Sequence, residues 1–197
     1  MTCQKIGVVI ARYNENIDWV KTVTHNIYLY NKGGDNIPNS INLPNVGREA
    51  QTYLYHIVKN YEKLDDYTVF LQGNPFDHAF HDHYPSIEMF NNVTFKKDFY
   101  PFNRKDLNYY TCTLLGEPFL NKDLVKFCHD HDFTLDVKNN IVEFVQGAQF
   151  AVSKQSIHKK DKSIYEKLLY SLSNNDPDQP SKEYAHVMER LWKYILA

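Results

Sequence analysis

The chain lacks the features that mark several classes of protein. Its three cysteines are scattered through 197 residues with no metal-ligand spacing, which favours reduced thiols in a cytoplasmic protein over a disulfide framework. The longest apolar run near the start, residues 6–11, is too short for a signal sequence or a membrane span. The formal net charge is −2, so we expect no nucleic-acid partner bound by bulk electrostatic attraction.

Glycine and arginine are also scarce. There are seven glycines, and only four arginines against 18 lysines. Where lysine is the default cation, an arginine is expected where its planar guanidinium fork is needed. A glycine is expected where the backbone tolerates no side chain. These expectations single out Arg12, Arg48, Arg104 and Arg190, and Gly47, Gly73 and Gly147.

The order of elements predicts an α/β fold. Residues 5–11 and 67–71 are short, apolar and rich in β-branched or aromatic side chains, as buried strands are. Residues 25–30 form a further strand, and residues 47–61 an amphipathic helix with Ala50, Tyr53, Leu54, Ile57, Val58 and Tyr61 on its apolar face. Strand, helix and strand in this order imply a mostly parallel sheet flanked by helices. Composition and length favour a single domain over residues 1–197.

The second half is less regular. We expect a short helix at residues 17–22, a helical turn at 86–91, and a helix that Asn121 caps and that ends near His129. Strands are expected on both sides of Gly147, at residues 141–146 and 149–152. Helices at residues 163–172 and 181–196 close the chain, the last with Tyr184, Val187, Met188, Leu191 and Ile195 on its core face.

Polar residues follow the first strand and open the first long helix. Ligands of open α/β sheets bind beyond the carboxyl ends of the strands, where Arg12, Asn14 and Glu15 lie. An ordinary solvated loop is the alternative. Asn45 is a plausible cap of the helix at 47–61, and Gly47 would let its backbone approach a ligand. Arg48 stands where the helix dipole already favours anions, although an Arg48–Glu49 surface pair would also explain it.

Three further groups are candidates. Gln72 and Asn74 follow the strand at 67–71, and Asp77 and His78, with His81 and His83, invite a metal interpretation. A surface histidine cluster is the alternative. Gly147 and Gln149 could seat a ligand, or Gly147 could form a bulge. His186, Glu189, Arg190 and Lys193 share one helix face, which a solvated surface with a Glu189–Lys193 pair would also explain.

Several of these segments resemble known families. Residues 8–15, Val-Val-Ile-Ala-Arg-Tyr-Asn-Glu, resemble the opening of GT-A nucleotide-sugar glycosyltransferases. Residues 45–50, Asn-Val-Gly-Arg-Glu-Ala, resemble a segment of rhamnan-synthesis-type transferases. With residues 30–33, 67–75, 147–152 and 189–192, the whole order is most similar to the glycosyltransferase-like proteins of domain-of-unknown-function family 3431, over about residues 6–196.

This resemblance implies a GT-A-like fold that binds a nucleotide sugar. Arg12, Asn14 and Glu15 would lie by the base and ribose, and Asn45, Gly47 and Arg48 by the ribose and donor sugar. Gln72, Asn74, Gly147 and Gln149 would complete the donor site. GT-A enzymes carry Asp-x-Asp where this chain has Gln72-Gly73-Asn74. A manganese or magnesium ion would therefore depend on Asp77, His78 and His186, or cationic side chains would neutralise the diphosphate instead.

The resulting functional prediction is transfer of a sugar from a nucleotide sugar to a hydroxyl acceptor, such as a carbohydrate, with Glu189 or Asp77 as the base. Two alternatives stay open. One is a non-catalytic nucleotide- or carbohydrate-binding protein on the same fold. The other is a metal-dependent hydrolase that uses Asp77, His78, His81 and His83.

Overall fold

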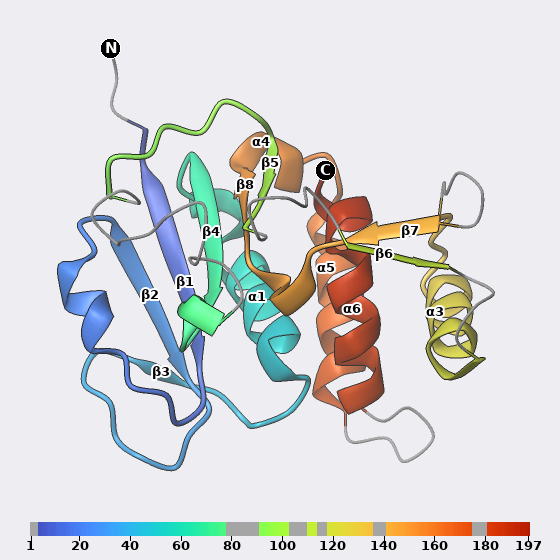
Figure 1. Cartoon of the computed structure of the whole chain (residues 1–197), viewed down its shortest axis with the longest axis horizontal. Coiled ribbons are helices and arrows are strands. Elements are labelled where there is room, and N and C mark those ends of the chain that lie inside the picture. The colour runs from blue at the N-terminus through green and yellow to red at the C-terminus, as the bar shows by residue number, and fades with distance from the viewer. Residues whose placement is uncertain (1–3, 78–90, 103–109, 114–117, 136–140, 175–180) are drawn as a thin grey trace.

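A six-stranded sheet in the order β3-β2-β1-β4-β8-β5 organises the computed structural model (Figure 1). The structure describes residues 4–77, 91–102, 110–113, 118–135, 141–174 and 181–197. Pairing is parallel from β3 through β4, whereas β8 is antiparallel to both β4 and β5. Among these six strands β8 alone therefore runs the other way. The strands are β1 (Ile6–Arg12), β2 (Asn26–Asn31), β3 (Ile41–Asn42), β4 (Tyr67–Gln72), β5 (Phe99–Pro101) and β8 (Phe150–Ser153).

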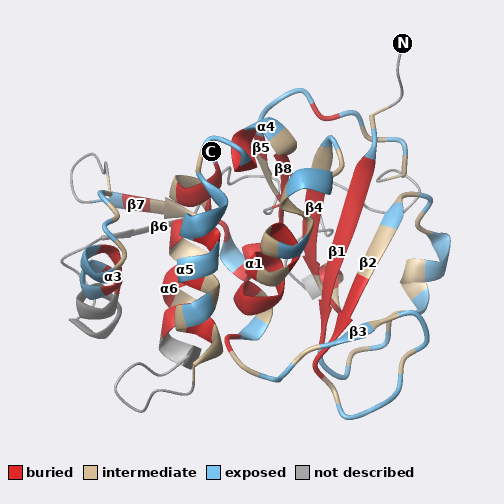
Figure 2. Ribbon diagram, turned by 180° about the vertical axis from the view of Figure 1, so that it is seen from behind, coloured by how far each residue is buried: buried red, intermediate tan, exposed pale blue. Residues whose placement is uncertain are grey.

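The central strands are apolar along their whole length because both of their faces are covered. All seven residues of β1 are buried, as Figure 2 shows. Val9 and Phe70 belong to the cluster on one face, and Val8 and Val69 to the cluster on the other. The structure confirms the predicted α/β class and the strands predicted at residues 5–11, 25–30 and 67–71, with boundaries shifted by one residue.

Three long helices cover one face of the sheet: α1 (Arg48–Asn60), α5 (Lys162–Ser173) and α6 (Ser181–Leu196) (Figure 1). The core face predicted for α6 is confirmed, since all five of its residues are buried. Trp192 was missing from that prediction. Its ring is fully buried, with its centroid 5.9 Å from Tyr53 and 5.5 Å from Phe150, so the indole joins α6 to α1 and to β8.

One further long helix, α3 (Pro118–Asp130), and several short elements complete the described residues. The short elements are the 3-10 turns η1 (Asp18–Thr22), η2 (Tyr61–Lys63), η3 (Pro75–Asp77) and η5 (Gln146–Ala148), the helix α4 (Lys154–Ile157), and the strands β6 (Tyr110–Thr113) and β7 (Ile141–Phe144). The helix expected at residues 17–22 is η1. Most of the turn expected at 86–91 lies outside the described residues. No helix among the described residues is long and apolar enough to span a membrane.

One local prediction in this half of the chain is wrong, and another is confirmed. Asn121 does not cap a helix, because α3 begins at Pro118 and Asn121 lies inside it. Proline is favoured at the first helical position, where its missing N–H costs no hydrogen bond. The strands expected on both sides of Gly147 are confirmed as β7 and β8, with boundaries shifted by one or two residues. β7 pairs with β6 in a two-stranded sheet beside α6, and η5 redirects the chain into β8 of the central sheet.

A buried histidine gives the core a pH dependence that can be measured. His56 is 2% exposed and its Nδ1 lies 2.9 Å from the Tyr30 hydroxyl, and burial lowers the pKa of His56 to about 3 from 6.5. Between about pH 3 and pH 6.5, His56 is therefore protonated in the unfolded chain and neutral in the folded chain. Relative to His56→Gln, the wild type should lose up to about 1.4 kcal/mol of unfolding free energy per pH unit on acidification below about 6.5. Urea unfolding across this pH range measures the difference, and parallel curves would contradict the buried neutral imidazole.

Candidate functional site

The carboxyl ends of β1, β2 and β4 and the N-terminus of α1 meet at one edge of the sheet (Figure 1). The chain passes from one side of β1 to the other between β3 and β4, and ligands of open α/β sheets bind beyond the strands at such a reversal. A pocket of about 280 Å³ opens there, lined by Ala11, Arg12, Tyr13, Glu15, Lys32, Asn45, Arg48, Glu49 and Gln72. The structure thus brings together five of the side chains that the sequence nominated.

The Arg12 side chain forms its hydrogen bonds with other residues of the protein. Its buried guanidinium forms a bidentate pair with Asp35, with both N···O distances at 2.7 Å. It also donates to the Asn31 side chain at 2.7 Å and to the carbonyls of Tyr13 and Glu15. Charge-assisted, bidentate contacts of this kind fix geometry. Arg12 therefore joins the loop after β1 to the loop after β2, and its predicted contact with a ligand stays a prediction.

Two glycines permit this loop arrangement. A Cβ on Gly33 would lie 1.9 Å from the Tyr13 carbonyl oxygen and 2.7 Å from the Asn14 Oδ1. A Cβ on Gly73 would lie 2.5 Å from a carboxylate oxygen of Glu15. Asn14 is exposed beside the turn that holds Gly33, and Glu15 lies over the backbone that follows β4. The scarcity of glycine thus correctly marked Gly73 as a position with no room for a side chain.

Lys32 is a functional candidate that the sequence analysis missed. Its buried ammonium group donates to the backbone carbonyls of Val46 and Arg48, at the start of α1. Burial lowers the pKa of Lys32 to about 7, against the opposing effect of the Glu49 charge. A lysine immediately after the buried strand β2 was the available signal. Lys32 ties the end of β2 to the entrance of α1 and adds a cationic group to the pocket wall.

The N-terminus of α1 has a different cap from the expected one. Gly47 is the N-cap residue, with φ +59°, and no side chain caps the helix. The predicted cap Asn45 is therefore wrong, and its exposed side chain lines the pocket. A Cβ on Gly47 would lie 2.9 Å from the Leu172 carbonyl oxygen, so the close approach that requires glycine here is to α5. An approach of Gly47 to a ligand stays a prediction.

Three side chains in the pocket have polar groups that the protein does not use. Within the described part of the chain, the side chains of Asn45, Arg48 and Gln72 form no hydrogen bond or ion pair. Arg48 is exposed and, like Gly47, has a left-handed φ, of +48°. A free guanidinium and two free amides, at a helix N-terminus that attracts anions, can bind phosphate and the polar edge of a base or sugar.

Residues of α6 border the same helix terminus. The Gly147 N–H donates to a Glu189 carboxylate oxygen at 2.6 Å, and Arg190 lies 3.1 Å from the other oxygen. Burial lowers the pKa of His186, and the charge of Arg48 adds to this effect. Lys193 pairs with Glu143 on β7. The helix face nominated from the sequence is thus partly buried, and Gly147 serves to hold Glu189 in place.

Comparison with known families agrees with the resemblance seen in the sequence. Residues 8–99 and 117–197 match the family described as Protein of unknown function (DUF3431). The chain belongs to the DUF3431 family. No curated protein and no solved structure matches it.

The remaining nominated residues of this DUF3431 protein lie away from the pocket or beyond description. Gln149 is fully buried, where it accepts from the Gln72 N–H and donates to the Pro75 carbonyl, so it shapes the turn after β4. Asn74 lies half-buried in that turn. Asp77 ends η3, but its side chain and the residues His78, His81 and His83 lie outside the described residues. Within the residues the structure does describe, no group of three or more His, Cys, Asp or Glu side chains could hold a metal.

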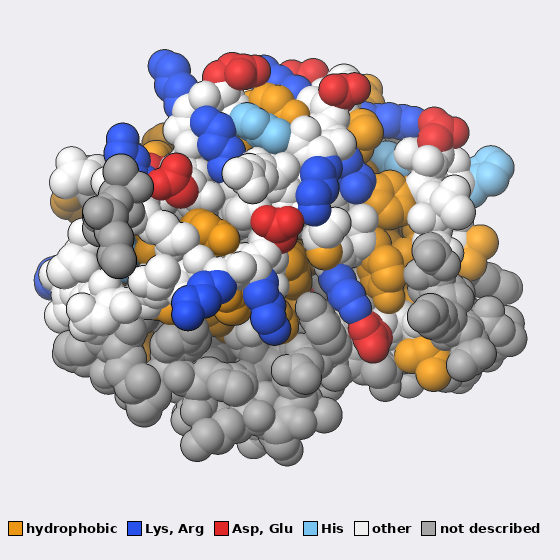
Figure 3. Space-filling model, turned by 90° about the horizontal axis from the view of Figure 1, so that it is seen from above, with side chains coloured by type: hydrophobic (Ala, Val, Ile, Leu, Met, Phe, Trp, Pro, Cys, Tyr) orange, Lys and Arg blue, Asp and Glu red, His pale blue; other side chains and the backbone are white. Residues whose placement is uncertain are grey.

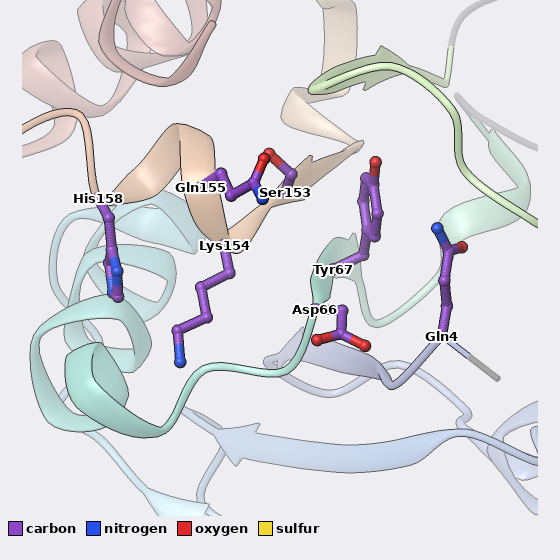
Figure 4. Close-up of a pocket in the computed structure, with 7 residues that line it drawn as sticks. All are labelled: Gln4, Asp66, Tyr67, Ser153, Lys154, Gln155 and His158. Atoms are coloured by element: carbon purple, nitrogen blue, oxygen red, sulfur yellow. The ribbon is translucent and has the colours of Figure 1, made fainter. Parts of the chain in front are cut away.

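A larger cavity lies at the opposite edge of the sheet, where β1 and β4 begin. It measures about 650 Å³ and is lined by Gln4, Asp66, Tyr67, Ser153, Lys154, Gln155 and His158 (Figure 4). Most of its polar groups already have internal partners. Gln4 exchanges two hydrogen bonds with the Phe95 backbone, Ser153 donates to Asp98, and His158 contacts the Tyr61 carbonyl. Seen from this side, basic and acidic side chains are interspersed (Figure 3). We therefore place the candidate site at the smaller pocket.

Alanine substitutions at two adjacent glycines, Gly33 and Gly34, test how closely the loops after β1 and β2 pack. We expect Gly33→Ala to lower the unfolding free energy by about 2 kcal/mol or more, because its Cβ would lie 1.9 Å from the Tyr13 carbonyl oxygen. Gly34→Ala is the matched control, since nothing lies within 4 Å of its Cβ. It should leave stability unchanged or raise it by up to about 1 kcal/mol. Equal effects of the two substitutions on urea unfolding would contradict the described packing.

Proposed function

We propose that the pocket beyond β1 and β4 binds the diphosphate group of a nucleotide sugar, and that the protein transfers the sugar to a hydroxyl acceptor. The observation that carries this proposal is the exposed guanidinium of Arg48 at the N-terminus of α1, which has no hydrogen-bond or ion-pair partner among the described residues. A cation in the first turn of a helix is unfavourable by itself, because the dipole there is positive. A bound anion would compensate for both positive charges.

A GT-A-like fold is part of the same proposal. Its support is the parallel order β3-β2-β1-β4, the nucleotide-binding half of doubly wound sheets, with β8 reversed next to β4. The residues similar to glycosyltransferase segments, 8–15 and 45–50, are the ones that flank the pocket. Membership of DUF3431 names no activity, so the proposal depends on the site.

The described residues favour neutralisation of the diphosphate by protein cations. Gln72 and Asn74 replace the carboxylates of Asp-x-Asp, and neutral amides are weak ligands for manganese or magnesium. Two carboxyl groups do line the pocket, those of Glu15 and Glu49. The Glu15 Oε2 already accepts the Tyr13 N–H at 2.7 Å, and the Glu49 carboxyl lies beside Arg48 and Lys32. Among the described residues, this donor set does not favour a metal that holds a diphosphate. Arg48 and Lys32 supply positive charge at the same pocket, where they would stabilise the departing diphosphate.

Ligand-induced thermal stabilisation tests the proposal. Nucleoside diphosphates and nucleotide sugars of the common bases are each added with manganese and with chelator. A ligand at 100 times its dissociation constant adds about 2.7 kcal/mol to the unfolding free energy. We expect a shift from one base, with little dependence on manganese. A shift that requires manganese would move the neutralising role to a metal, and no shift from any member would contradict the donor site.

Arg48→Ala tests the carrying observation directly. Because charge-assisted hydrogen bonds contribute roughly 1.5–3 kcal/mol, we expect at least a tenfold loss of affinity for the stabilising nucleotide. The ligand-free melting temperature should be unchanged, since Arg48 is exposed and pairs with no other residue that the structure describes. Lys63→Ala, an exposed cation beyond the other end of α1, is the control. Equal losses of nucleotide affinity in both variants, or a lower melting temperature of Arg48→Ala without ligand, would contradict a specific role of Arg48 in binding.

A further inference from the structure

Glu49 lies in the pocket, although the sequence analysis treated it only as a surface partner of Arg48. It is the second residue of α1, it is partly buried, and its side chain helps to line the pocket with Arg48 and Gln72. From the other side it experiences the charge of Glu189 on α6. The pocket thus has two neighbouring carboxyl groups on two helices.

These two carboxyl groups have different surroundings. Glu189 has donors on both oxygens, the Gly147 N–H at 2.6 Å and the Arg190 guanidinium at 3.1 Å, and its side chain is 17% exposed. Among the described residues, the only hydrogen bond to the Glu49 carboxyl comes from its own backbone N–H. Glu189 is therefore fixed by its donors, whereas Glu49 is free to face a ligand.

The surroundings of Glu49 suit a group that exchanges protons. Burial, assisted by the Glu189 charge, raises the pKa of Glu49 to about 7, while Arg48 and Lys32 oppose the shift. A carboxyl that titrates near neutral pH can both accept and release a proton during a reaction.

We propose that Glu49 is the general base of the site and accepts the proton of the acceptor hydroxyl. This inference rests on the proposed function. As the hydroxyl oxygen bonds to the anomeric carbon, its proton passes to a Glu49 oxygen. The bond between that carbon and the phosphate oxygen breaks, and its electron pair leaves with the nucleoside diphosphate beside Arg48. Glu189, the base nominated from the sequence, becomes a positioning residue. A single displacement of this kind inverts the anomeric centre.

The charged and titratable groups around Glu49 come from four parts of the fold. The end of β1 and the loop after it contribute Arg12 and Glu15, and the residue after β2 is Lys32. On α1 the neighbours are Arg48 and Tyr53, whose buried hydroxyl has no hydrogen-bond partner among the described residues. Helix α6 contributes His186, Glu189 and Arg190.

Glu49→Gln removes the proton acceptor and keeps the shape. The probes are the nucleotide sugars of the thermal-shift panel, with water and simple monosaccharides as acceptors and release of nucleoside diphosphate as the readout. We expect affinity within threefold of wild type and turnover reduced by about 10²–10⁴-fold. Wild-type turnover should rise with pH, with its midpoint near pH 7, and level off above it, and the remaining turnover of Glu49→Gln should lack this rise.

Two further variants distinguish a catalytic role of Glu49 from a nonspecific effect of removing a carboxylate. Glu189→Gln removes the neighbouring charge, so the rise in rate should move to lower pH. Glu62→Gln replaces an exposed carboxylate of η2 and should match the wild type in rate and pH profile. Wild-type turnover in Glu49→Gln, or an unchanged profile in Glu189→Gln, would overturn the inference and leave donor binding intact. Absence of binding by the wild type would overturn the proposed function, whereas binding without turnover would overturn transfer and this inference alone.

A stability measurement requires no substrate. The raised pKa means that folded wild type holds the Glu49 proton more tightly than the unfolded chain does. The unfolding free energy of the wild type should therefore fall, relative to Glu49→Gln, as pH rises from about 4.5 to about 7. Stability curves that stay parallel over this range would show an ordinary exposed carboxylate and overturn the inference.

Discussion

The contacts of the Arg12 guanidinium determine the shape of the pocket. This one side chain joins the carbonyls of the loop after β1 to the Asn31 and Asp35 side chains after β2. With both loops fixed, Glu15 covers the backbone of Gly73 at the end of β4. Lys32, the residue after Asn31, then reaches the carbonyls at the start of α1. A buried guanidinium that loses its acceptors lowers the stability of the fold. The contacts of Arg12 and Lys32 therefore fix the positions of the three strand ends and the helix N-terminus relative to one another.

The pocket therefore divides its cations between two roles. Arg12 and Lys32 are buried and donate to backbone and side-chain oxygens of neighbouring segments. Arg48 is exposed and has no such partner within the described residues. Lysine bound to two carbonyls acts through its compact charge, whereas the planar fork of arginine can grip a carboxylate or a phosphate. Arg12 and Lys32 therefore stabilise the loops that form the pocket, whereas the Arg48 guanidinium is available to a ligand.

Local patterns predicted the elements well and the contacts between them less well. The β-branched run at β1 and the apolar face of α1 follow from burial and helical period, which are visible in a short window. The cap of α1 was mistaken because Gly47 is required by Leu172, 125 residues further along the chain. The sequence did not indicate the role of Lys32 or the internal contacts of Arg12 for the same reason, since the acceptors of both side chains become neighbours only after the sheet forms. The separation of β7 from β8 likewise depends on a partner strand, β6, that is not adjacent in sequence.

The absence of carboxylates after β4 is consistent with the charges that surround it. Glu15, Glu49 and Glu189 already border this part of the molecule, from three different elements. Aspartates in place of Gln72 and Asn74 would increase the repulsion of a diphosphate, which only a strongly bound divalent cation would offset. Under the proposed function, neutral amides there leave Arg48 and Lys32 to attract the diphosphate without a metal between them. Burial, assisted by the Glu189 charge, raises the pKa of Glu49 at the same pocket, so the proposed protein-cation site also favours a base that works near neutral pH.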